Sequence, residues 1–347
     1  MSNRAAVMPG LGRIEIRDVP EPLPGPRDAV VAIEAVGVCG SDTAYFTHGR
    51  IGDWVVDGPL ILGHEVSGRV VSVGEAVTRV AVGDRVAIEP GRPCRDCEDC
   101  SAGRYHLCAR LEFLATPPYD GALVQRVAFD ERNLFVIPEG MSFEEAALCE
   151  PLSVGIWACR RAGLQAGDRV LVSGAGPVGI LAAQVARAEG ASSVVVSDVS
   201  DFRLDKARGL GFEVERSGSV DEGPGHEDVD VLLECSGAPG VLAQGLWRLR
   251  NAGRAAMVGM PKQDVSLPLS RLNVKEISLA LVNRYAHTWP TAIALVSSGR
   301  VDVSAIVTHR FSLDDTEQAL TLASQVPDSL KAVVYPQGLP SHGAVSA

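Results

Sequence analysis

The feature that most constrains the fold is a glycine-rich segment, GAGPVG at residues 174–179, which follows an apolar run and opens a helical pattern that ends at Gly190. In a strand–turn–helix unit, the first glycine of this spacing permits a tight turn, the second lets the backbone approach a pyrophosphate, and the third lets helix and strand pack closely. The candidate cofactor-binding residues are therefore Gly174, Gly176, Pro177, Val178 and Gly179. Strand and helix patterns alternate from 168 to about 282, which predicts a parallel, doubly wound sheet.

The next predicted strand ends at Asp198, 24 residues after Gly174. A carboxylate at that place can accept hydrogen bonds from both hydroxyls of a ribose and would repel a 2′-phosphate, so the sequence favours NAD over NADP. A glycine-rich turn with a solvent-facing acid is the alternative. Arg203 follows five residues later and either lies near the adenine or is an ordinary surface cation.

The rest of the chain predicts a second, β-rich domain. Valine-rich runs at 28–40, 67–74 and 84–90 are bounded by Gly, Pro and Asp and indicate short strands, which we expect in a partly open barrel. A chain of 347 residues favours two domains. We expect the β-rich domain to comprise 1–152 and 287–347, with the dinucleotide-binding domain at 153–286 between them.

A helical pattern covers 142–164 near the expected boundary between the domains. Ser142 is the expected N-cap, and Glu145 completes a capping box with it. After Trp289, a helix at 290–299, a strand near 306–311 and a final strand are expected to return to the N-terminal domain.

Four of the eight cysteines fall within 15 residues, in the segment 91–110. They are Cys94, Cys97, Cys100 and Cys108. Two-residue gaps let successive sulfurs converge on one ion, and four thiolates leave no position for water, so this spacing indicates a structural zinc. Ordinary reduced thiols and an iron–sulfur cluster are the alternatives. A disulfide framework suits short secreted chains, and the first residues lack a secretory h-region, so we expect a cytoplasmic protein.

A second metal site is indicated by Cys39 and the adjacent pair His64 and Glu65, which stand near the ends of predicted strands. A catalytic zinc needs about three protein ligands and one open position. Cys39 and His64 supply two, and the spacing leaves Glu65, Glu150 and Cys149 open as the third.

The charge balance excludes other classes of partner. Thirty-two basic and 43 acidic residues give a net charge of −11, with no basic run for nucleic acid. No window approaches 18 uninterrupted apolar residues, so no membrane-spanning helix is expected.

Four motifs together resemble the zinc-dependent medium-chain dehydrogenase/reductase family. They are the GHE motif at 63–65 with its following glycines, the CGSD motif at 39–42, the four-cysteine segment and the GAGPVG turn. The resemblance runs from about residue 4 to residue 335. Within the family it is closest to the sorbitol and related polyol dehydrogenases, through VAIEPG at 86–91, ATPPYDG at 115–121, EPLSVGIWACRR at 150–161, RYAHTWP at 284–290 and VTHRF at 307–311.

The resemblance implies a Rossmann domain inserted in a GroES-like β-rich catalytic domain, with NAD and two zinc ions per chain, one catalytic and one structural. It implies that Cys39, His64 and Glu65 bind the catalytic zinc and that Glu150 binds it directly or through water. It also implies a homotetramer or homodimer. The positions that match a polyol pocket are Ser41, Tyr45, Phe113, Thr116, Glu150, Arg284 and Tyr285, and Ser41, His64, Glu65 and Glu150 are the implied catalytic residues.

Two departures bear on these expectations. Ala44 stands where a histidine is common, so a proton exit would need another group such as His48, and Asn283 replaces a usual aromatic. The sequence therefore predicts a zinc- and NAD-dependent polyol dehydrogenase that oxidises a secondary hydroxyl to a ketose. The alternatives are a dehydrogenase of threonine or a simple alcohol, and a redox-dead NAD-binding protein on the same fold.

Overall fold

The computed structural model describes residues 2–217 and 229–340, and its contacts divide the chain into two compact units. Unit 1 comprises Met1–Glu150 with Val307–Ala347, and unit 2 comprises Pro151–Ile306. The first boundary lies two residues before the expected 152. The second lies at 306 rather than 286.

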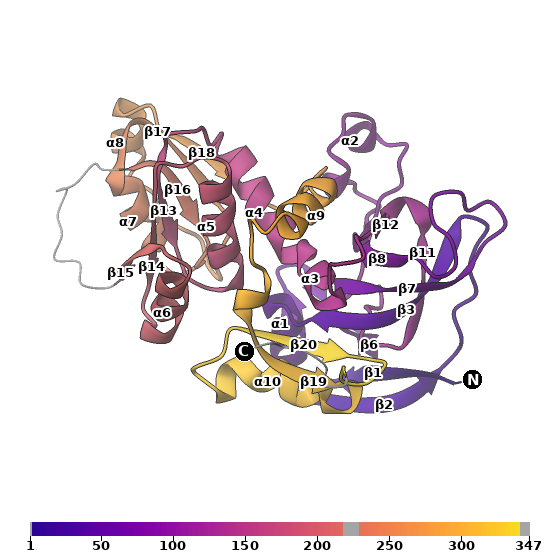
Figure 1. Ribbon diagram of the computed structural model, residues 1–347. Coiled ribbons are helices and arrows are strands. Elements are labelled where there is room, and N and C mark those ends of the chain that lie inside the picture. The colour runs from indigo at the N-terminus through magenta and orange to yellow at the C-terminus, as the bar shows by residue number, and fades with distance from the viewer. Residues whose placement is uncertain (1, 218–228, 341–347) are drawn as a thin grey trace. The chain divides into compact units, whose positions relative to one another are not determined.

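Unit 1 is built mainly from antiparallel strands (Figure 1). Its main sheet has the order β12-β8-β7-β3-β20-β19, with β11 also paired to β3, and a smaller sheet has the order β2-β1-β6. The strands are β1 (Asn3–Gly10), β2 (Arg13–Val19), β3 (Asp28–Gly37), β4 (Arg50–Ile51), β5 (Trp54–Val55), β6 (Leu60–Ile61), β7 (Glu65–Val73), β8 (Arg85–Ile88), β9 (Gly91–Arg92), β10 (Glu112–Phe113), β11 (Arg126–Asp130), β12 (Leu134–Val136), β19 (Val307–Ser312) and β20 (Lys331–Tyr335).

The helices of unit 1 are short. They are α1 (Gly40–His48), α2 (Glu98–Ser101), α3 (Phe143–Ala147) and α10 (Thr316–Gln325), with 3₁₀ turns at Tyr105–Leu107, Glu131–Asn133 and Leu313–Asp315. The main core lies beneath the sheets and includes Ile33, Val66 and Ile88, all fully buried. Valine-rich strands form here because β-branched side chains pack well on a pleated surface.

The register of β3 positions the candidate metal site. Gly37, at the end of β3, is paired with Glu65 of β7 and with Val333 of β20. One end of the main sheet therefore gathers Cys39, two residues after β3, and Lys331, at the start of β20. Residues more than 260 positions apart in the sequence meet at this end.

Unit 2 contains a six-stranded, entirely parallel sheet of order β15-β14-β13-β16-β17-β18. Right-handed crossovers on either side of β13 put α5 and α7 on opposite faces, as Figure 1 shows. The doubly wound sheet expected from the sequence is confirmed. The elements are α4 (Cys149–Arg161), β13 (Arg169–Ser173), α5 (Pro177–Ala188), β14 (Ser193–Asp198), α6 (Asp201–Gly209), β15 (Glu213–Arg216), β16 (Val229–Glu234), α7 (Val241–Arg248), β17 (Leu249–Met257), α8 (Leu269–Val274), β18 (Ser278–Leu281), α9 (Trp289–Ser297) and a 3₁₀ turn at Ser304–Ile306.

Two local expectations differ from the structure. The helix expected at 142–164 is two helices, α3 and α4, which separate at Leu148, although the capping box of Ser142 and Glu145 is present. Residues 287–306 belong to unit 2 and do not return to the N-terminal domain. Arg160 of α4 donates hydrogen bonds to the carbonyl of His287 (2.9 Å) and to Thr291 (3.0 Å), which holds α9 within unit 2.

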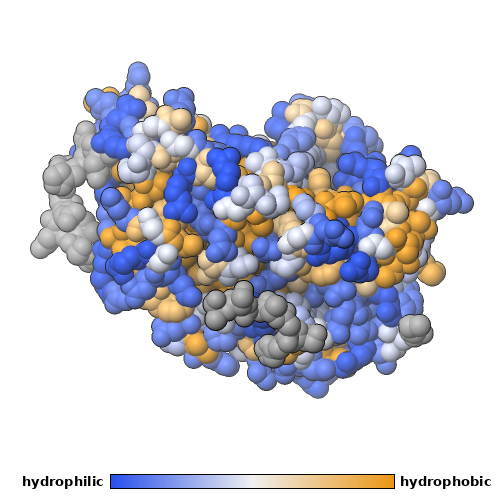
Figure 2. All heavy atoms as spheres, in the orientation of Figure 1, coloured by the Kyte–Doolittle hydropathy of each residue, from blue (hydrophilic) through white to orange (hydrophobic). Residues whose placement is uncertain are grey.

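The face of the molecule in Figure 2 carries hydrophilic residues with separate hydrophobic patches between them. None of the helices in the described part of the chain combines the length and the apolar character that crossing a membrane requires.

Candidate functional site

The four cysteines of the 91–110 segment lie together in unit 1. Their sulfur atoms are all within 4.8 Å of one another, and none is in a disulfide. The Sγ–Sγ distances are 3.4 Å from Cys94 to Cys108, 3.8 Å from Cys94 to Cys100 and 3.9 Å from Cys97 to Cys108. A tetrahedron of Zn–S bonds near 2.3 Å has edges of about 3.8 Å, so this donor set fits a closed zinc site.

The backbone helps to shape this site. Arg95 adopts a positive φ of 68°, and α2 begins directly after Cys97. A hydrogen bond from the backbone of Cys100 is the largest of the effects that lower the pKa of Cys97 to about 7. A lowered thiol pKa favours the thiolate, which is the form that binds a metal.

A second group of possible ligands consists of Cys39, His64 and Glu65, whose ligand atoms lie within 4.8 Å of one another. Cys39 is the N-cap residue of α1, Glu65 is the first residue of β7, and His64 immediately precedes that strand. His64 and Glu65 are buried, with 7% and 1% of their surfaces exposed. One thiolate, one imidazole and one carboxylate form a three-ligand set that fits zinc and leaves a fourth position for another group.

Asp42 fixes the orientation of two of these residues. Its Oδ2 accepts a hydrogen bond from the backbone N–H of Cys39 (2.9 Å), and its Oδ1 accepts one from that of Gly63 (2.9 Å). The same Oδ1 lies 3.4 Å from Nδ1 of His64, which leaves Nε2 for a metal. Burial lowers the pKa of His64, but the charges of Asp42 and Cys39 outweigh burial and raise it well above its ordinary value.

Lys331 is the cation of this centre, and the sequence reasoning missed it. Its Nζ donates to both carboxylate oxygens of Glu65, at 2.7 and 2.9 Å, and to the carbonyl of Val38 at 2.9 Å. Burial lowers the pKa of Lys331, but the negative charges of Glu65 and Cys39 outweigh burial and raise it. Two anionic ligands are thereby balanced by a buried ammonium group, 266 positions from Glu65.

Gly37 provides the space for this pair. A Cβ atom at Gly37 would lie 2.0 Å from Oε2 of Glu65, so only glycine fits opposite that carboxylate.

The other candidate ligands lie outside the group. Glu150 is buried, with 5% exposed, and its charge contributes to raising the pKa of both Lys331 and Glu89. Cys149 is fully buried, and its Sγ donates to the carbonyl of Glu145 at 3.7 Å. Among the described residues, the structure therefore brings Glu65, and neither Glu150 nor Cys149, into contact distance with Cys39 and His64.

The residues expected to line a polyol pocket fall in both units. Ser41 and Tyr45 belong to α1, and the ring of Phe113 lies 5.6 Å from that of His64. Thr116 is half-buried and donates its backbone N–H to the carbonyl of Phe113. These four belong to unit 1.

Two further expected pocket residues belong to unit 2. Arg284 has a positive φ of 55°, and Tyr285 is 2% exposed and packs edge-on against Trp289. Their role in a substrate pocket stays a prediction, as does a proton exit through His48, which is exposed at the end of α1.

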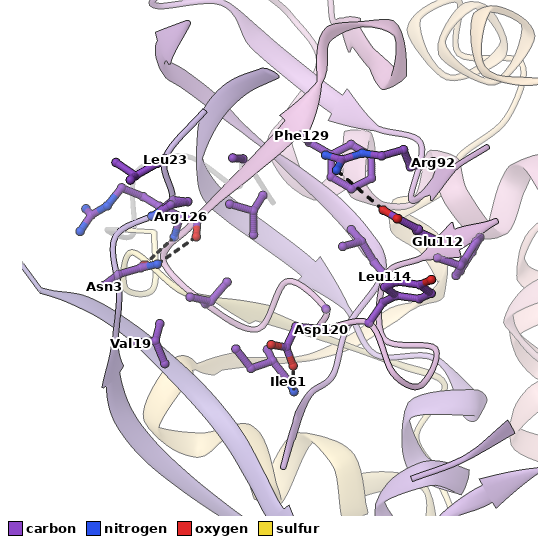
Figure 3. A pocket seen from close by; sticks show the side chains of 17 residues that line it. Asn3, Val19, Leu23, Ile61, Arg92, Glu112, Leu114, Asp120, Arg126 and Phe129 are labelled. Carbon is purple, nitrogen blue, oxygen red and sulfur yellow. Dashed lines mark hydrogen bonds and ion pairs between the residues drawn. The ribbon is translucent and has the colours of Figure 1, made fainter. Parts of the chain in front are cut away.

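Unit 1 also has a cavity of about 350 Å³ (Figure 3). Its walls include Phe113, Phe129, Arg92 and Asp120. The guanidinium group of Arg92 lies 5.0 Å above the ring of Phe129. Of the expected polyol-pocket residues only Phe113 lines it, so we do not assign this cavity to the substrate.

The glycine-rich turn of unit 2 has the geometry that a pyrophosphate requires. Gly174 has a φ of 97°, and a Cβ atom at Gly179 would lie 1.8 Å from the carbonyl oxygen of Gly174. Nothing lies within 4 Å of the Cβ position at Gly176, which caps α5 with Pro177 in its first turn. Open space above the N-terminus of a twelve-residue helix suits a phosphate group.

Asp198 stands at the end of β14, as expected, and it also supports the turn. Its Oδ2 accepts a hydrogen bond from the backbone N–H of Ala175 (2.7 Å), and its Oδ1 accepts one from that of Ser200 (2.8 Å). Nη1 of Arg203 lies 3.9 Å from the same carboxylate, with 38% of the Arg203 side chain exposed. Each carboxylate oxygen retains a lone pair, so Asp198 can still accept from a ribose.

Comparisons with known proteins bear on both units. Residues 25–139 match the alcohol dehydrogenase GroES-like domain, and residues 177–298 match the zinc-binding dehydrogenase family. Sorbitol dehydrogenase of Bacillus subtilis (strain 168) is 41% identical over 342 residues, which is 96% of this chain and 97% of that protein.

Solved structures of other proteins superpose on this chain over nearly its whole length. The 2R,3R-butanediol dehydrogenase of Bacillus subtilis superposes with a TM-score of 0.88 at 29% identity, over 96% of this chain and all of that one. A Sinorhizobium meliloti 1021 protein bound to NADP superposes with a TM-score of 0.89 at 27% identity, over 97% of this chain and all of that one.

Proposed function

This chain belongs to the zinc-dependent medium-chain dehydrogenase/reductase family, close to sorbitol dehydrogenase, and from that premise we propose that it oxidises a secondary hydroxyl of a polyol to a ketose with NAD. The family expected from the sequence is confirmed. The chain is an oxidoreductase whose cofactors are zinc and a nicotinamide dinucleotide, in a GroES-like domain with an inserted Rossmann domain. The observation that carries the proposal is the convergence of Cys39, His64 and Glu65 around one point.

In the proposed mechanism, Cys39, His64 and Glu65 would hold a zinc ion, whose Lewis-acid chemistry would lower the pKa of an alcohol hydroxyl. Asp42 holds the imidazole of His64 in one orientation, and Lys331 holds the carboxylate of Glu65. Ser41 accepts the proton that the substrate hydroxyl loses and passes it toward solvent. The 174–179 turn and Asp198 would hold NAD, which would supply the hydride acceptor.

A polyol is favoured over a plain alcohol because several polar groups are proposed to face the substrate. An alkyl chain in place of a hydroxyl-bearing one would remove a hydrogen bond from each of four side chains, those of Ser41, Tyr45, Thr116 and Glu150. Buried polar groups left without a partner cost far more than one missing methylene, so such a site rejects the alkyl analogue strongly.

A substrate panel tests this proposal. Sorbitol, xylitol and arabinitol are compared with 2-propanol, ethanol and threonine, each with NAD and with NADP. The proposal expects the highest kcat/KM with a polyol and NAD. A higher value for 2-propanol or threonine would support the alternative substrate, which the likeness to butanediol dehydrogenase keeps open. No turnover of any alcohol by protein that holds two zinc ions per chain would support the redox-dead alternative.

The cofactor preference has its own test. Asp198→Ala removes the carboxylate that is proposed to repel a 2′-phosphate, so the ratio of kcat/KM with NAD to that with NADP should fall. An unchanged ratio would remove Asp198 from the cofactor site.

We also propose a homotetramer or homodimer in the cytoplasm. The location is supported by the eight cysteines, which are all free thiols in the structure. Light scattering on the purified protein and fractionation of the source cells test the two statements.

A further inference from the structure

Glu234 is a buried acid that the proposed reaction does not use. It ends β16, where it pairs with Ser173 of β13 and with Met257 of β17. Only 1% of its surface is exposed. Its position is therefore the carboxyl edge of the sheet, between the two strands that flank β16.

The loops that follow β13, β16 and β17 pack backbone to backbone around this position. A Cβ atom at Gly174 would lie 2.9 Å from the N–H nitrogen of Ser236, and one at Gly259 would lie 2.1 Å from that of Gly237. A Cβ atom at Gly259 would also lie 2.9 Å from Oε2 of Glu234. Glycine is needed at each of these contacts because no side chain fits between the loops.

The two carboxylate oxygens of Glu234 have different surroundings. Oε1 accepts hydrogen bonds from the backbone N–H groups of Ser236 (2.8 Å) and Gly237 (3.0 Å) and from the hydroxyl of Ser236. Oε2 is buried and has no hydrogen-bond partner. No cation in the described part of the chain forms an ion pair with this carboxylate.

A buried carboxylate without a cation is costly to desolvate, and such groups in native proteins are usually paired. The fold indicates what could balance it. Strand order reverses between β13 and β16, which is where parallel sheets of this order bind a dinucleotide. If Asp198, on the β14 side, holds the adenosine half as proposed, the nicotinamide half would extend toward β16 and β17.

We propose that Glu234 is a positioning residue for the nicotinamide half of the cofactor and that its negative charge favours the oxidised cofactor over the reduced one. The inference rests on the proposed function. The nicotinamide ring carries a positive charge in NAD⁺ and none in NADH. A buried negative charge near that half would attract only the oxidised ring. The loop at Ser236 and Gly237, which Glu234 holds by hydrogen bonds, would contribute equally to binding of the oxidised and the reduced cofactor.

Glu234→Gln separates the charge from the loop contact. The carbonyl oxygen of Gln can accept the same three hydrogen bonds, whereas the charge is lost. Dissociation constants for NAD⁺, NADH and ADP-ribose are measured by calorimetry on the zinc-loaded enzyme. Loss of an attraction between unlike charges in partly buried surroundings should weaken NAD⁺ binding roughly tenfold. NADH and ADP-ribose should bind within about twofold of wild type.

A residue that only holds the loop would change the affinities for NAD⁺ and NADH by the same factor, so an unchanged ratio overturns the inference. Glu234→Asp keeps the charge and should keep the wild-type ratio even if both affinities fall, which preserves the test if the Gln variant folds poorly. Glu213→Gln, an exposed acid of the same unit, is the matched control and should change nothing. Wild-type enzyme that binds neither NAD⁺ nor NADH would refute the proposed function itself, which is a distinct result.

Discussion

The four-cysteine segment and the Cys39 centre, which is the group Cys39, His64 and Glu65, each gather possible metal ligands around a point of their own. They are assembled in different ways. The first takes all four sulfurs from 15 consecutive residues, three of them half-buried, in a segment with exposed ion pairs such as that of Arg110 with Asp96. The second takes its ligands from α1 and β7 and its counter-charge from β20, with Glu65 and Lys331 almost fully buried.

This difference in ligands is the one expected between a structural zinc, which stabilises a loop, and a catalytic zinc. Four thiolates saturate a zinc ion, whereas a Cys–His–Glu set leaves a position open. A buried, mixed ligand set needs a second layer to orient it, and Asp42 and Lys331 form that layer. The predictions below test whether the two regions are as distinct as this geometry indicates.

The largest expected difference is in activity. Cys39→Ser should lower kcat/KM by at least about 10³-fold, because a serine hydroxyl is a poor zinc ligand and the Lewis acid is lost. Cys100→Ser should instead remove the other zinc and lower the stability, with kcat of the folded fraction within about tenfold of wild type. Metal content and kcat/KM are measured together on each variant. Equal activity losses, with the catalytic zinc retained in Cys100→Ser, would contradict the distinction.

The second prediction concerns the buried ion pair. Lys331→Met leaves the charge of Glu65 without a partner in a buried place, so the free energy of unfolding should fall by about 3–5 kcal/mol. Arg104→Met breaks an exposed pair with Asp99 in the four-cysteine segment and should cost less than about 1 kcal/mol. Urea unfolding of the zinc-loaded proteins measures both. The double variant Glu65→Gln/Lys331→Met should recover part of the loss, and a cost for Lys331→Met no larger than that of Arg104→Met would refute the argument.

The third prediction concerns Glu89, a buried acid in contact with the four-cysteine segment. Its carboxylate accepts a hydrogen bond from Tyr105 of the four-cysteine segment at 2.8 Å. Burial is the largest of the effects that raise its pKa from 4.5 to about 7, and the charge of Glu150 adds to it. A raised pKa in the folded state means that stability is fully present below about pH 4.5 and is lost as the pH rises through 7.

Glu89→Gln should therefore gain stability relative to wild type between pH 5 and pH 8, by up to about 3 kcal/mol. Thermal and urea unfolding at both pH values provide the measurement. Glu98→Gln, an exposed acid of the same segment, should give a difference from wild type that does not vary with pH. A difference for Glu89→Gln that is constant across this range would show that the carboxyl is not perturbed by burial.

The two regions also differ in how far the sequence reveals them. The four cysteines are readable because their spacing is local, and the GAGPVG turn because its glycines serve contacts within one strand–turn–helix unit. Asp42 had a local signal, since it stands three residues after Cys39 at the position of a helix capping box. Lys331 had none, because its contact with Glu65 arises from the pairing of β3 with β7 and β20.

The same reasoning explains the errors of the fold prediction. Apolar spacing continues through 142–164, so the pattern did not reveal the break at Leu148, although Pro151, which lacks an N–H and suits the first turn of a helix, could have indicated a new start. The pairing of residues 287–306 with unit 2 depends on Arg160, a side chain whose partners lie more than 120 positions away. Contacts of that range carry no periodic signal.

The smallest expected effect tests the second layer alone. Asp42→Asn keeps the shape of the side chain but removes the charge that faces Nδ1 of His64, so zinc at the Cys39 centre should bind about 10–100-fold more weakly. Glu98→Gln, in the four-cysteine segment, removes an exposed charge and should alter zinc affinity there by less than about threefold. Competition with a chelator, read separately for the two zinc ions, gives both values. If the two substitutions weaken their sites equally, the exposed site depends on its surroundings as much as the buried one, and burial does not distinguish the two centres.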